Sequence, residues 1–228
     1  MDEVHLFCVA FDECTTALTA AWSILGAEER VRAEGFISAP VRERYVRSHA
    51  FLRNVLSTFV GEDPARVAFE RLPNGKPVLF DALSRGVWFN LSHCRTHVAV
   101  AVAGTPHVGV DVECVRDGTD SLGIARRFFS PAEFQRLANC SPERVDEMFV
   151  RIWTAKEAFL KAIGAGISYG LDRVIVREDG ETDLALAEVP SECGPASAWS
   201  LRNRTLALGC HLALAVNVPS VPVVERVR

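Results

Sequence analysis

The sequence predicts an α+β protein built from two similar halves in a pseudo-twofold arrangement. Stretches with the helical spacing of apolar residues alternate with short runs rich in Val and Ala that are typical of strands. Two segments also occur twice, in the same order: residues 50–53 (AFLR) resemble residues 158–161 (AFLK), and residues 97–102 (HVAVAV) resemble residues 211–216 (HLALAV). Chance matching of common apolar residues is the alternative explanation. We expect residues 1–105 to form the first half and residues 106–228 the second.

In the first half, each element has a local signal at its boundary. Ser38 and Pro40 indicate a helix start, and Gly61 indicates its end. Asn74 and Gly75 predict a turn between two short strands. The expected strands cover residues 4–11, 67–72, 76–79, 87–91 (ending at Ser92 and His93) and 97–103, and the expected helices cover residues 18–34 and 39–60.

The second half is expected to open with a strand at residues 109–113. Ser130 and Glu133, with Pro131 between them, form the pattern of a capping box and predict a helix start. The expected helices cover residues 122–128, residues from 131 onward, and residues 142–161, the last one stopped by Gly164. Two hairpins are expected, at residues 174–187 and 199–218. From residue 219 onward we expect a frayed tail.

Composition excludes several functional classes. The formal charge of −4 gives no basic excess for general nucleic-acid binding. No apolar run approaches the roughly 20 residues of a membrane span, and residues 1–3 are acidic where a signal peptide is basic. We therefore expect a soluble, cytoplasmic protein. The seven cysteines include no CxxC pair, so they predict neither a disulfide framework nor a zinc site, but buried small hydrophobes.

One helix and one strand carry the residues with chemical potential. Within residues 153–162, Glu157 and Lys161 share a helix face with Thr154, because the three are spaced i, i+3 and i+7. Within residues 109–113, Asp111 and Glu113 alternate with valines and so point to the same side of a strand. If strand and helix lie side by side, carboxylates and lysines converge, which suits a divalent cation and a phosphate-bearing substrate.

Each of these residues also has an ordinary explanation when it is taken alone. Asp111 and Glu113 can be solvated residues of an edge strand, and Glu157 with Lys161 can be a surface i,i+4 pair worth a few tenths of a kcal/mol. Lys76, His93 and Arg44 are, singly, a turn lysine, a turn histidine and a solvated arginine. Their joint order is the specific signal.

That order resembles a known family. The segments at residues 74–77 (NGKP), 89–93 (FNLSH), 109–113 (GVDVE) and 153–161 (WTAKEAFLK) are together closely similar to those of the Sfp-type 4′-phosphopantetheinyl transferases. The resemblance implies the two-lobed fold of that family in a monomer. It also implies a Mg²⁺-dependent transfer of phosphopantetheine from coenzyme A to a serine of an apo acyl or peptidyl carrier protein, in polyketide, nonribosomal peptide or fatty acid synthesis.

The resemblance assigns roles position by position. Asp111, Glu113 and Glu157 match the metal ligands, Glu157 also matches the general base, and Lys161 matches the lysine at the departing 3′,5′-ADP. The positions that match coenzyme A contacts are Arg44, Lys76, Pro77, Ser92, His93, Asp111, Lys156 and Lys161. Arg32 matches one of two basic residues that often precede the first phenylalanine of the family, but Glu29 stands where the other is usual. The carrier is expected to dock at residues 117–134, where Arg126, Arg127, Phe128 and Phe129 are candidate contacts.

Two other functions are possible from the sequence alone. A non-catalytic module that binds coenzyme A or a nucleotide would keep the pocket, but binding alone does not require Glu157. A metal-dependent phosphoesterase usually has more histidine and carboxylate ligands, and only His93 is near in motif order.

Overall fold

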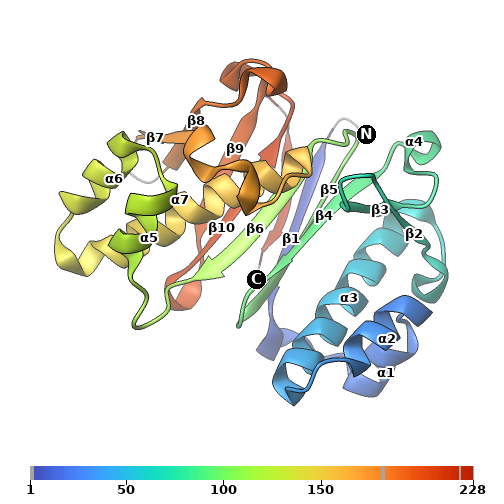
Figure 1. Cartoon of the computed structure of the whole chain (residues 1–228). Coiled ribbons are helices and arrows are strands. Elements are labelled where there is room, and N and C mark those ends of the chain that lie inside the picture. Colours follow the sequence, from blue (N-terminus) through green and yellow to red (C-terminus); the bar gives the residue numbers. More distant parts are fainter. Residues whose placement is uncertain (1–2, 181–182, 221, 228) are drawn as a thin grey trace.

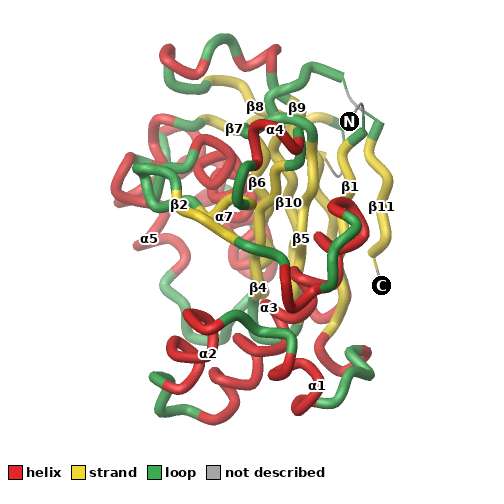
Figure 2. Tube along the Cα trace, turned by 90° about the vertical axis from the view of Figure 1, so that its right-hand side faces the viewer, coloured by secondary structure: helices red, strands yellow, loops and turns green. Residues whose placement is uncertain are grey.

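The computed structural model, which describes residues 3–180, 183–220 and 222–227, consists of two α+β halves packed side by side (Figure 1). In each half a long helix covers a sheet whose strands are mainly antiparallel. The helices lie on the two outer flanks of the molecule and the strands run between them, as Figure 1 and the perpendicular view in Figure 2 show. Among the described residues, no helix has the length and apolar character needed to cross a membrane.

The first half is organised around β5, a fully buried strand. Its sheet has the order β11-β1-β5-β4. The strands β1 (Val4–Ala10), β5 (His97–Ala103) and β4 (Trp88–His93) pair antiparallel, and β11 (Val223–Val227) pairs in parallel with β1. A separate ribbon pairs β2 (Phe69–Arg71) with β3 (Pro77–Leu79). The helices of this half are α1 (Leu18–Ser23), α2 (Ala27–Glu34), α3 (Ala39–Val60) and α4 (Ala82–Arg85).

The second half is organised in the same way around β10. Its sheet has the order β6-β10-β9, formed by β6 (Val108–Cys114), β10 (Cys210–Val216) and β9 (Ser200–Thr205). A hairpin pairs β7 (Ile175–Asp179) with β8 (Asp183–Glu188); Thr182, within the predicted hairpin, lies outside the described residues. The helices are α5 (Ser121–Phe128), α6 (Pro131–Ala138) and α7 (Pro142–Ile163).

The long helices α3 and α7 have the equivalent positions that the repeated segments predict. Each is 22 residues long, starts after a serine with a proline in its first turn, and ends at a glycine in the left-handed conformation, Gly61 (φ 68°) or Gly164 (φ 72°). The strands β5 and β10 are both fully buried central strands. The predicted fold class, with two similar α+β halves, is therefore confirmed.

Three predictions about elements need correction. The expected helix at residues 18–34 is two helices, separated at Gly26. The second strand of the last predicted hairpin, expected from residue 205, is β10 and begins only at Cys210, after a 3-10 turn at Ala207–Gly209. The expected tail contains β11 (Val223–Val227), which pairs in parallel with β1. The chain returns to the first sheet because Val223 and Val227 pack against the core cluster there. The boundary after residue 105 stays a prediction.

The expectation that the cysteines form no disulfide is also wrong. Cys114 at the end of β6 and Cys210 at the start of β10 are directly opposite each other in register and form a disulfide of 2.07 Å. The two residues are 96 positions apart in the chain, so only the pairing of the strands brings them together.

The seam between the halves runs along β4 and β6. The Asn90 side-chain oxygen accepts a hydrogen bond from the Val110 amide (2.9 Å), and the Ser92 hydroxyl accepts one from the Val112 amide (3.3 Å). On the other side of β6, Gly109 allows close contact with α7, because a Cβ atom there would lie 2.1 Å from the Ala158 carbonyl oxygen. The polar end of β6 is thereby held between β4 and α7.

Candidate active site

The seam holds a cleft that gathers most of the residues predicted to carry chemistry. It has a volume of about 340 Å³. The side chains come from β4, β6 and α7, the three elements that the seam brings together. The residues lining it include Ser92, His93, Asp111, Glu113, Trp153, Glu157 and Lys161.

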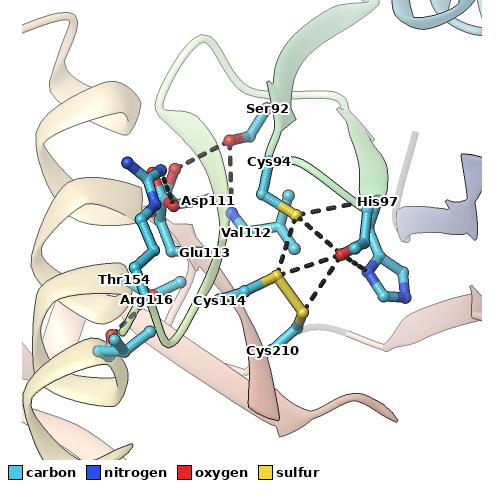
Figure 3. Close-up of polar contacts among 12 residues, drawn as sticks. Ser92, Cys94, His97, Asp111, Val112, Glu113, Cys114, Arg116, Thr154 and Cys210 are labelled. Atoms are coloured by element: carbon cyan, nitrogen blue, oxygen red, sulfur yellow. Dashed lines mark hydrogen bonds and ion pairs between the residues drawn. A yellow bond between two sulfur atoms is a disulfide. The ribbon is translucent and has the colours of Figure 1, made fainter. Parts of the chain in front are cut away.

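Asp111 is the most buried of the three carboxylates, at 4% exposure. Its Oδ1 atom accepts hydrogen bonds from the Ser92 hydroxyl (2.8 Å, Figure 3) and from the Lys161 ammonium (2.6 Å), which also donates to the Ser92 hydroxyl (2.9 Å). Its Oδ2 atom is buried and has no hydrogen-bond partner. An anionic oxygen without a donor is costly in this environment, so the geometry favours a cation or a ligand proton beside Oδ2.

Glu157, like Asp111, has a carboxylate oxygen without a hydrogen-bond donor. Its Oε1 atom is buried without a partner. Burial and then the negative charge of Asp111 are the main causes that raise the pKa of Glu157, which is about 7; Lys161 opposes this rise and Glu113 adds to it. A carboxyl group with this pKa exchanges its proton near neutral pH, which is the property of a general base.

Glu113 lies at the outer end of the set and is paired with Arg116, whose guanidinium donates to Oε2 at 2.9 Å (Figure 3). Burial and the charge of Asp111 raise the pKa of Glu113, while Arg116 and Lys161 lower it. Among the described residues, these three carboxylates do not form a group whose oxygens all lie within 4.8 Å of one another. They border one cleft without meeting at a single point.

A larger basic cavity continues from the carboxylates along the first half. It has a volume of about 620 Å³ and shares His93 and Glu113 with the cleft. The basic residues that line it are Arg32, Arg44, His49, His93, Arg95 and Arg116. The His93 ring is exposed at the cleft, yet partial loss of hydration, together with the charges of His49, Lys161 and Arg44, lowers its pKa. The cavity offers a cationic surface for a phosphate-bearing ligand.

Three of these basic residues were missed by sequence reasoning. Arg95 directly follows the 89–93 motif in the chain but is not part of it, and Arg116 follows β6 by two positions. His49 lies on α3, and its Nδ1 atom is 2.7 Å from Glu29. The only available signal was the clustering of basic residues close to the motifs. Arg30 does not replace the basic residue that is missing at Glu29, because it does not line this cavity and its guanidinium donates to the Ser23 carbonyl.

Lys156 is outside the cleft, which corrects its predicted role as a coenzyme A contact. Its side chain is fully buried on another face of α7. The ammonium donates to the Glu133 carboxylate (2.6 Å) and to the carbonyls of Leu171 (2.9 Å) and Val174 (2.5 Å). All three donors are therefore used inside the second half, and none is left for a ligand.

Lys76 needs the same correction. Its ammonium donates to the carbonyls of Pro106 (2.9 Å), Val108 (3.0 Å) and Ala162 (3.0 Å), and so joins the loop after β2 to the second half. Burial lowers the pKa of Lys76 to about 8. Its neighbour Pro77 lines a different cavity, of about 600 Å³, together with Arg32, His49 and Lys161.

The segment predicted to dock the carrier, residues 117–134, contains both core residues and surface residues. Phe129 is buried and stacks on Phe149, with ring centroids 5.5 Å apart, so it is a core residue and not a contact. Arg126 and Arg127 are exposed on α5, where their guanidinium groups lie over aromatic rings.

Comparison with known proteins agrees with this geometry. Residues 107–210 match the family described as the 4′-phosphopantetheinyl transferase superfamily, and residues 11–105 match the family described as 4′-phosphopantetheinyl transferase, N-terminal. The chain is 34% identical to the 4′-phosphopantetheinyl transferase HetI of Nostoc sp. over 217 residues, which cover 94% of this chain and 88% of HetI. It is 30% identical to the 4′-phosphopantetheinyl transferase Sfp of Bacillus subtilis over 75% of each chain.

A third relative, the 4′-phosphopantetheinyl transferase psf-1 of Bacillus pumilus, is 36% identical over 73% of this chain and 70% of its own length. The fold and the cleft define a transferase with an acidic centre and a cationic substrate cavity. The chain belongs to the 4′-phosphopantetheinyl transferase family.

Proposed function

We propose that the protein transfers the 4′-phosphopantetheine arm of coenzyme A to a serine hydroxyl of an apo carrier protein, in a Mg²⁺-dependent reaction. The observation that carries the proposal is the pair of buried carboxylate oxygens without donors, Asp111 Oδ2 and Glu157 Oε1, in one cleft with Lys161. The adjoining basic cavity, which contains Arg44 and His93, is the proposed site for the nucleotide and its 3′-phosphate.

In the proposed reaction, the serine oxygen forms a bond to the β-phosphorus of coenzyme A. The bond between that phosphorus and the bridging oxygen of the diphosphate breaks, and 3′,5′-ADP leaves. Glu157, with its pKa of about 7, takes the serine proton. Lys161 is held by Asp111 and Ser92, where its ammonium can neutralise or protonate the departing phosphate.

The residues present fit a magnesium ion. Mg²⁺ is held in proteins by one or two carboxylates plus substrate phosphates and water, so donors around an open cleft suit it better than a closed cage. Asp111 and Glu157 would hold the ion through their unpartnered oxygens, and Glu113, whose carboxylate does not meet theirs here, would join them on leaving Arg116. When bound, the ion would neutralise charge on the diphosphate and stabilise its spread in the transition state.

The carrier and the oligomeric state are further parts of the proposal. The exposed arginines Arg126 and Arg127 on α5 suit an acidic carrier surface. A monomer is sufficient, because both halves of the cleft come from one chain. The carriers proposed as substrates are those of polyketide, nonribosomal peptide or fatty acid synthesis.

The test is to incubate the protein with Mg²⁺, coenzyme A and a panel of apo carrier domains, and to weigh the carriers. We expect the mass of one phosphopantetheine to be added to at least one carrier. Glu157→Gln should lower the rate by about 10²–10⁴-fold, the usual contribution of a general base. Glu143→Gln, on the same helix but exposed, is the matched control.

A non-catalytic module that binds coenzyme A would give a different result. Coenzyme A would bind, by calorimetry, and no carrier in the panel would gain mass. Undiminished modification by Glu157→Gln would show that the transferase uses another base.

A further inference from the structure

Four soft donor groups converge below the cleft, at the point where the two halves meet. Cys94 and His97 flank the turn between β4 and β5, Cys114 ends β6, and Cys210 starts β10. One ligand atom from each of these residues lies within 4.8 Å of the other three, and all four residues are buried. Figure 3 shows the sulfur atoms of Cys94, Cys114 and Cys210 and the imidazole of His97 gathered close together.

The four groups face a common point, which is occupied by the Thr96 hydroxyl. Its oxygen lies 3.5 Å from the Cys94 sulfur, 3.2 Å from the Cys114 sulfur and 3.3 Å from the Cys210 sulfur. The same oxygen lies 2.8 Å from His97 Nδ1. One polar atom thus contacts all four donors, which is the arrangement of ligands around a centre.

The disulfide accounts for only part of this arrangement. It uses Cys114 and Cys210 and gives no reason for a third sulfur, Cys94, at 3.3 Å from Cys114, or for the imidazole of His97. In a tetrahedral zinc site with Zn–S bonds of about 2.3 Å, the sulfur atoms are about 3.8 Å apart. The Cys94–Cys114 spacing is already close to this value, so only the disulfide must open and the Thr96 hydroxyl turn aside.

We propose that Cys94, His97, Cys114 and Cys210 bind one Zn²⁺ ion as a Cys₃His site when the disulfide is reduced. A dithiol reductant supplies the two electrons and two protons, closes into its own disulfide, and leaves Cys114 and Cys210 as thiols. Zn²⁺ then replaces the protons of the three thiols, which are released, and the neutral imidazole is the fourth ligand. Thiolate and imidazole are the donors that zinc takes in closed structural sites.

The structure also provides a route to the site. A cavity of about 450 Å³ is lined by Thr96 and His97, and its charged lining residues are Asp12, Glu13 and Arg95. The two carboxylates outnumber the one guanidinium, so this entrance favours a divalent cation.

The position of the proposed site explains what the metal would do. Cys94 directly follows His93, and Cys114 directly follows Glu113, so two of the ligands adjoin two residues of the cleft. A zinc ion would join β4 and β5 of the first half to β6 and β10 of the second. It is therefore a structural metal that fixes the cleft walls, separate from the carboxylates proposed for magnesium.

Cobalt titration tests the proposal, because tetrahedral Co²⁺ bound by thiolates gives intense visible bands and a thiolate-to-metal charge-transfer band. The protein is reduced with dithiothreitol, freed of it without air, and titrated with Co²⁺ and then with Zn²⁺. We expect one Co²⁺ per chain with both spectral signatures, displaced by an equal amount of Zn²⁺. Cys94→Ser should lose the charge-transfer intensity of one thiolate and weaken Zn²⁺ binding by more than about 100-fold, the upper range for loss of an outer-shell partner.

Cys140→Ser is the matched control, since Cys140 is a free cysteine that donates to the Arg136 carbonyl and is not one of the four clustered residues, so it should change neither the bands nor the affinity. Native mass spectrometry of the wild-type chain with Zn²⁺ gives a second measurement that needs no variant. A reduced protein that takes up no stoichiometric metal, or a Cys94→Ser variant with wild-type bands and affinity, would overturn the proposal.

Discussion

Two lysines on α7, five positions apart, have different surroundings and therefore different roles. Lys156 is fully buried and paired with the Glu133 carboxylate inside the second half. Lys161 has 28% of its side chain exposed and lies in the cleft beside Asp111. Lys156 therefore neutralises a buried carboxylate, whereas Lys161 is accessible to a substrate.

Replacing each lysine by methionine should separate these roles. Lys156→Met leaves the Glu133 carboxylate buried and unpaired, which should lower the free energy of unfolding by about 3–5 kcal/mol. Lys161→Met should cost less stability, because the Lys161 side chain is 28% exposed and its ion pair is partly hydrated, and it should abolish carrier modification. Urea unfolding and the carrier assay measure the two effects. Equal loss of stability in the two variants would contradict this assignment.

Glu157 gives a prediction about pH. Its pKa in the folded protein, about 7, is above the ordinary value of 4.5, so between these values the folded state binds more protons than the unfolded state. Stability therefore falls as pH rises through this window. Without Mg²⁺, Glu157→Gln should raise the Tm at pH 8, where it removes a poorly solvated charge, and change it little at pH 5. A Tm change of the same size at both pH values would count against the raised pKa.

The sequence predicts the positions of some of these side chains and not of others. The spacing of Glu157 and Lys161 along α7 puts them on one face, and the alternation in β6 does the same for Asp111 and Glu113, because both patterns are local. Lys156 adjoins Glu157 in the chain, but its surroundings depend on Glu133 in α6, and no local pattern contains that contact.

At the scale of elements, the contact between β6 and α7 decides where the carboxylates lie. It depends on Gly109, where a Cβ atom would be 2.1 Å from the Ala158 carbonyl oxygen and 2.3 Å from the Ala162 amide nitrogen. Both neighbours are backbone atoms of a helix and cannot turn aside. Any side chain at this position must push the strand away from the helix.

Gly109→Ala should therefore lower both stability and activity. Overpacking of this kind costs about 1–3 kcal/mol, and the displaced strand moves Asp111 and Glu113 away from Glu157. Thermal unfolding and the carrier assay are the measurements. Gly166→Ala is the matched control, because no atom lies within 4 Å of a Cβ there and it should be close to neutral. Wild-type activity in Gly109→Ala would show that the close approach is not needed.

Most element boundaries were predictable, because caps, turns and apolar spacing are local. The capping box at Ser130 and Glu133 is present as expected, with the Ser130 hydroxyl accepting from the Glu133 amide. The break at Gly26 was missed, because the apolar spacing continues across it. The turn before Lys76 was predicted from its sequence. The three hydrogen bonds of the Lys76 ammonium to the second half are tertiary contacts, and no pattern in the sequence indicates them.

At the scale of the whole molecule, the first sheet contains strands from both ends of the chain. β11 pairs in parallel with β1, with Val223 opposite Val4 and Val227 opposite Cys8. Strands more than 200 residues apart share no local signal, so the tail at residues 219–228 was predicted to be frayed. The pairing covers the outer side of β1, which would otherwise present unpaired backbone groups.

Removing residues 219–228 should destabilise the first half. Loss of the contacts of Val223 and Val227 with the core should cost about 2 kcal/mol. For a chain of this size that lowers the Tm by about 4–8 °C. Val223→Asp with Val227→Asp keeps the chain length and should have a similar effect. Thermal unfolding and light scattering measure stability and aggregation, and an unchanged Tm in both variants would show that β11 adds nothing to the sheet.

The closing strand also sets an order of events during synthesis. Among the described strands, β1 is made before all others, and its outer neighbour β11 is made after them. The amino-terminal half therefore cannot complete its sheet when its own residues have emerged, but waits with an open edge until the carboxy-terminal half has been made. The first half should therefore reach its full stability only after β11 has been made, and ribosome-bound chains stalled before residue 223 should remain sensitive to proteases in β1.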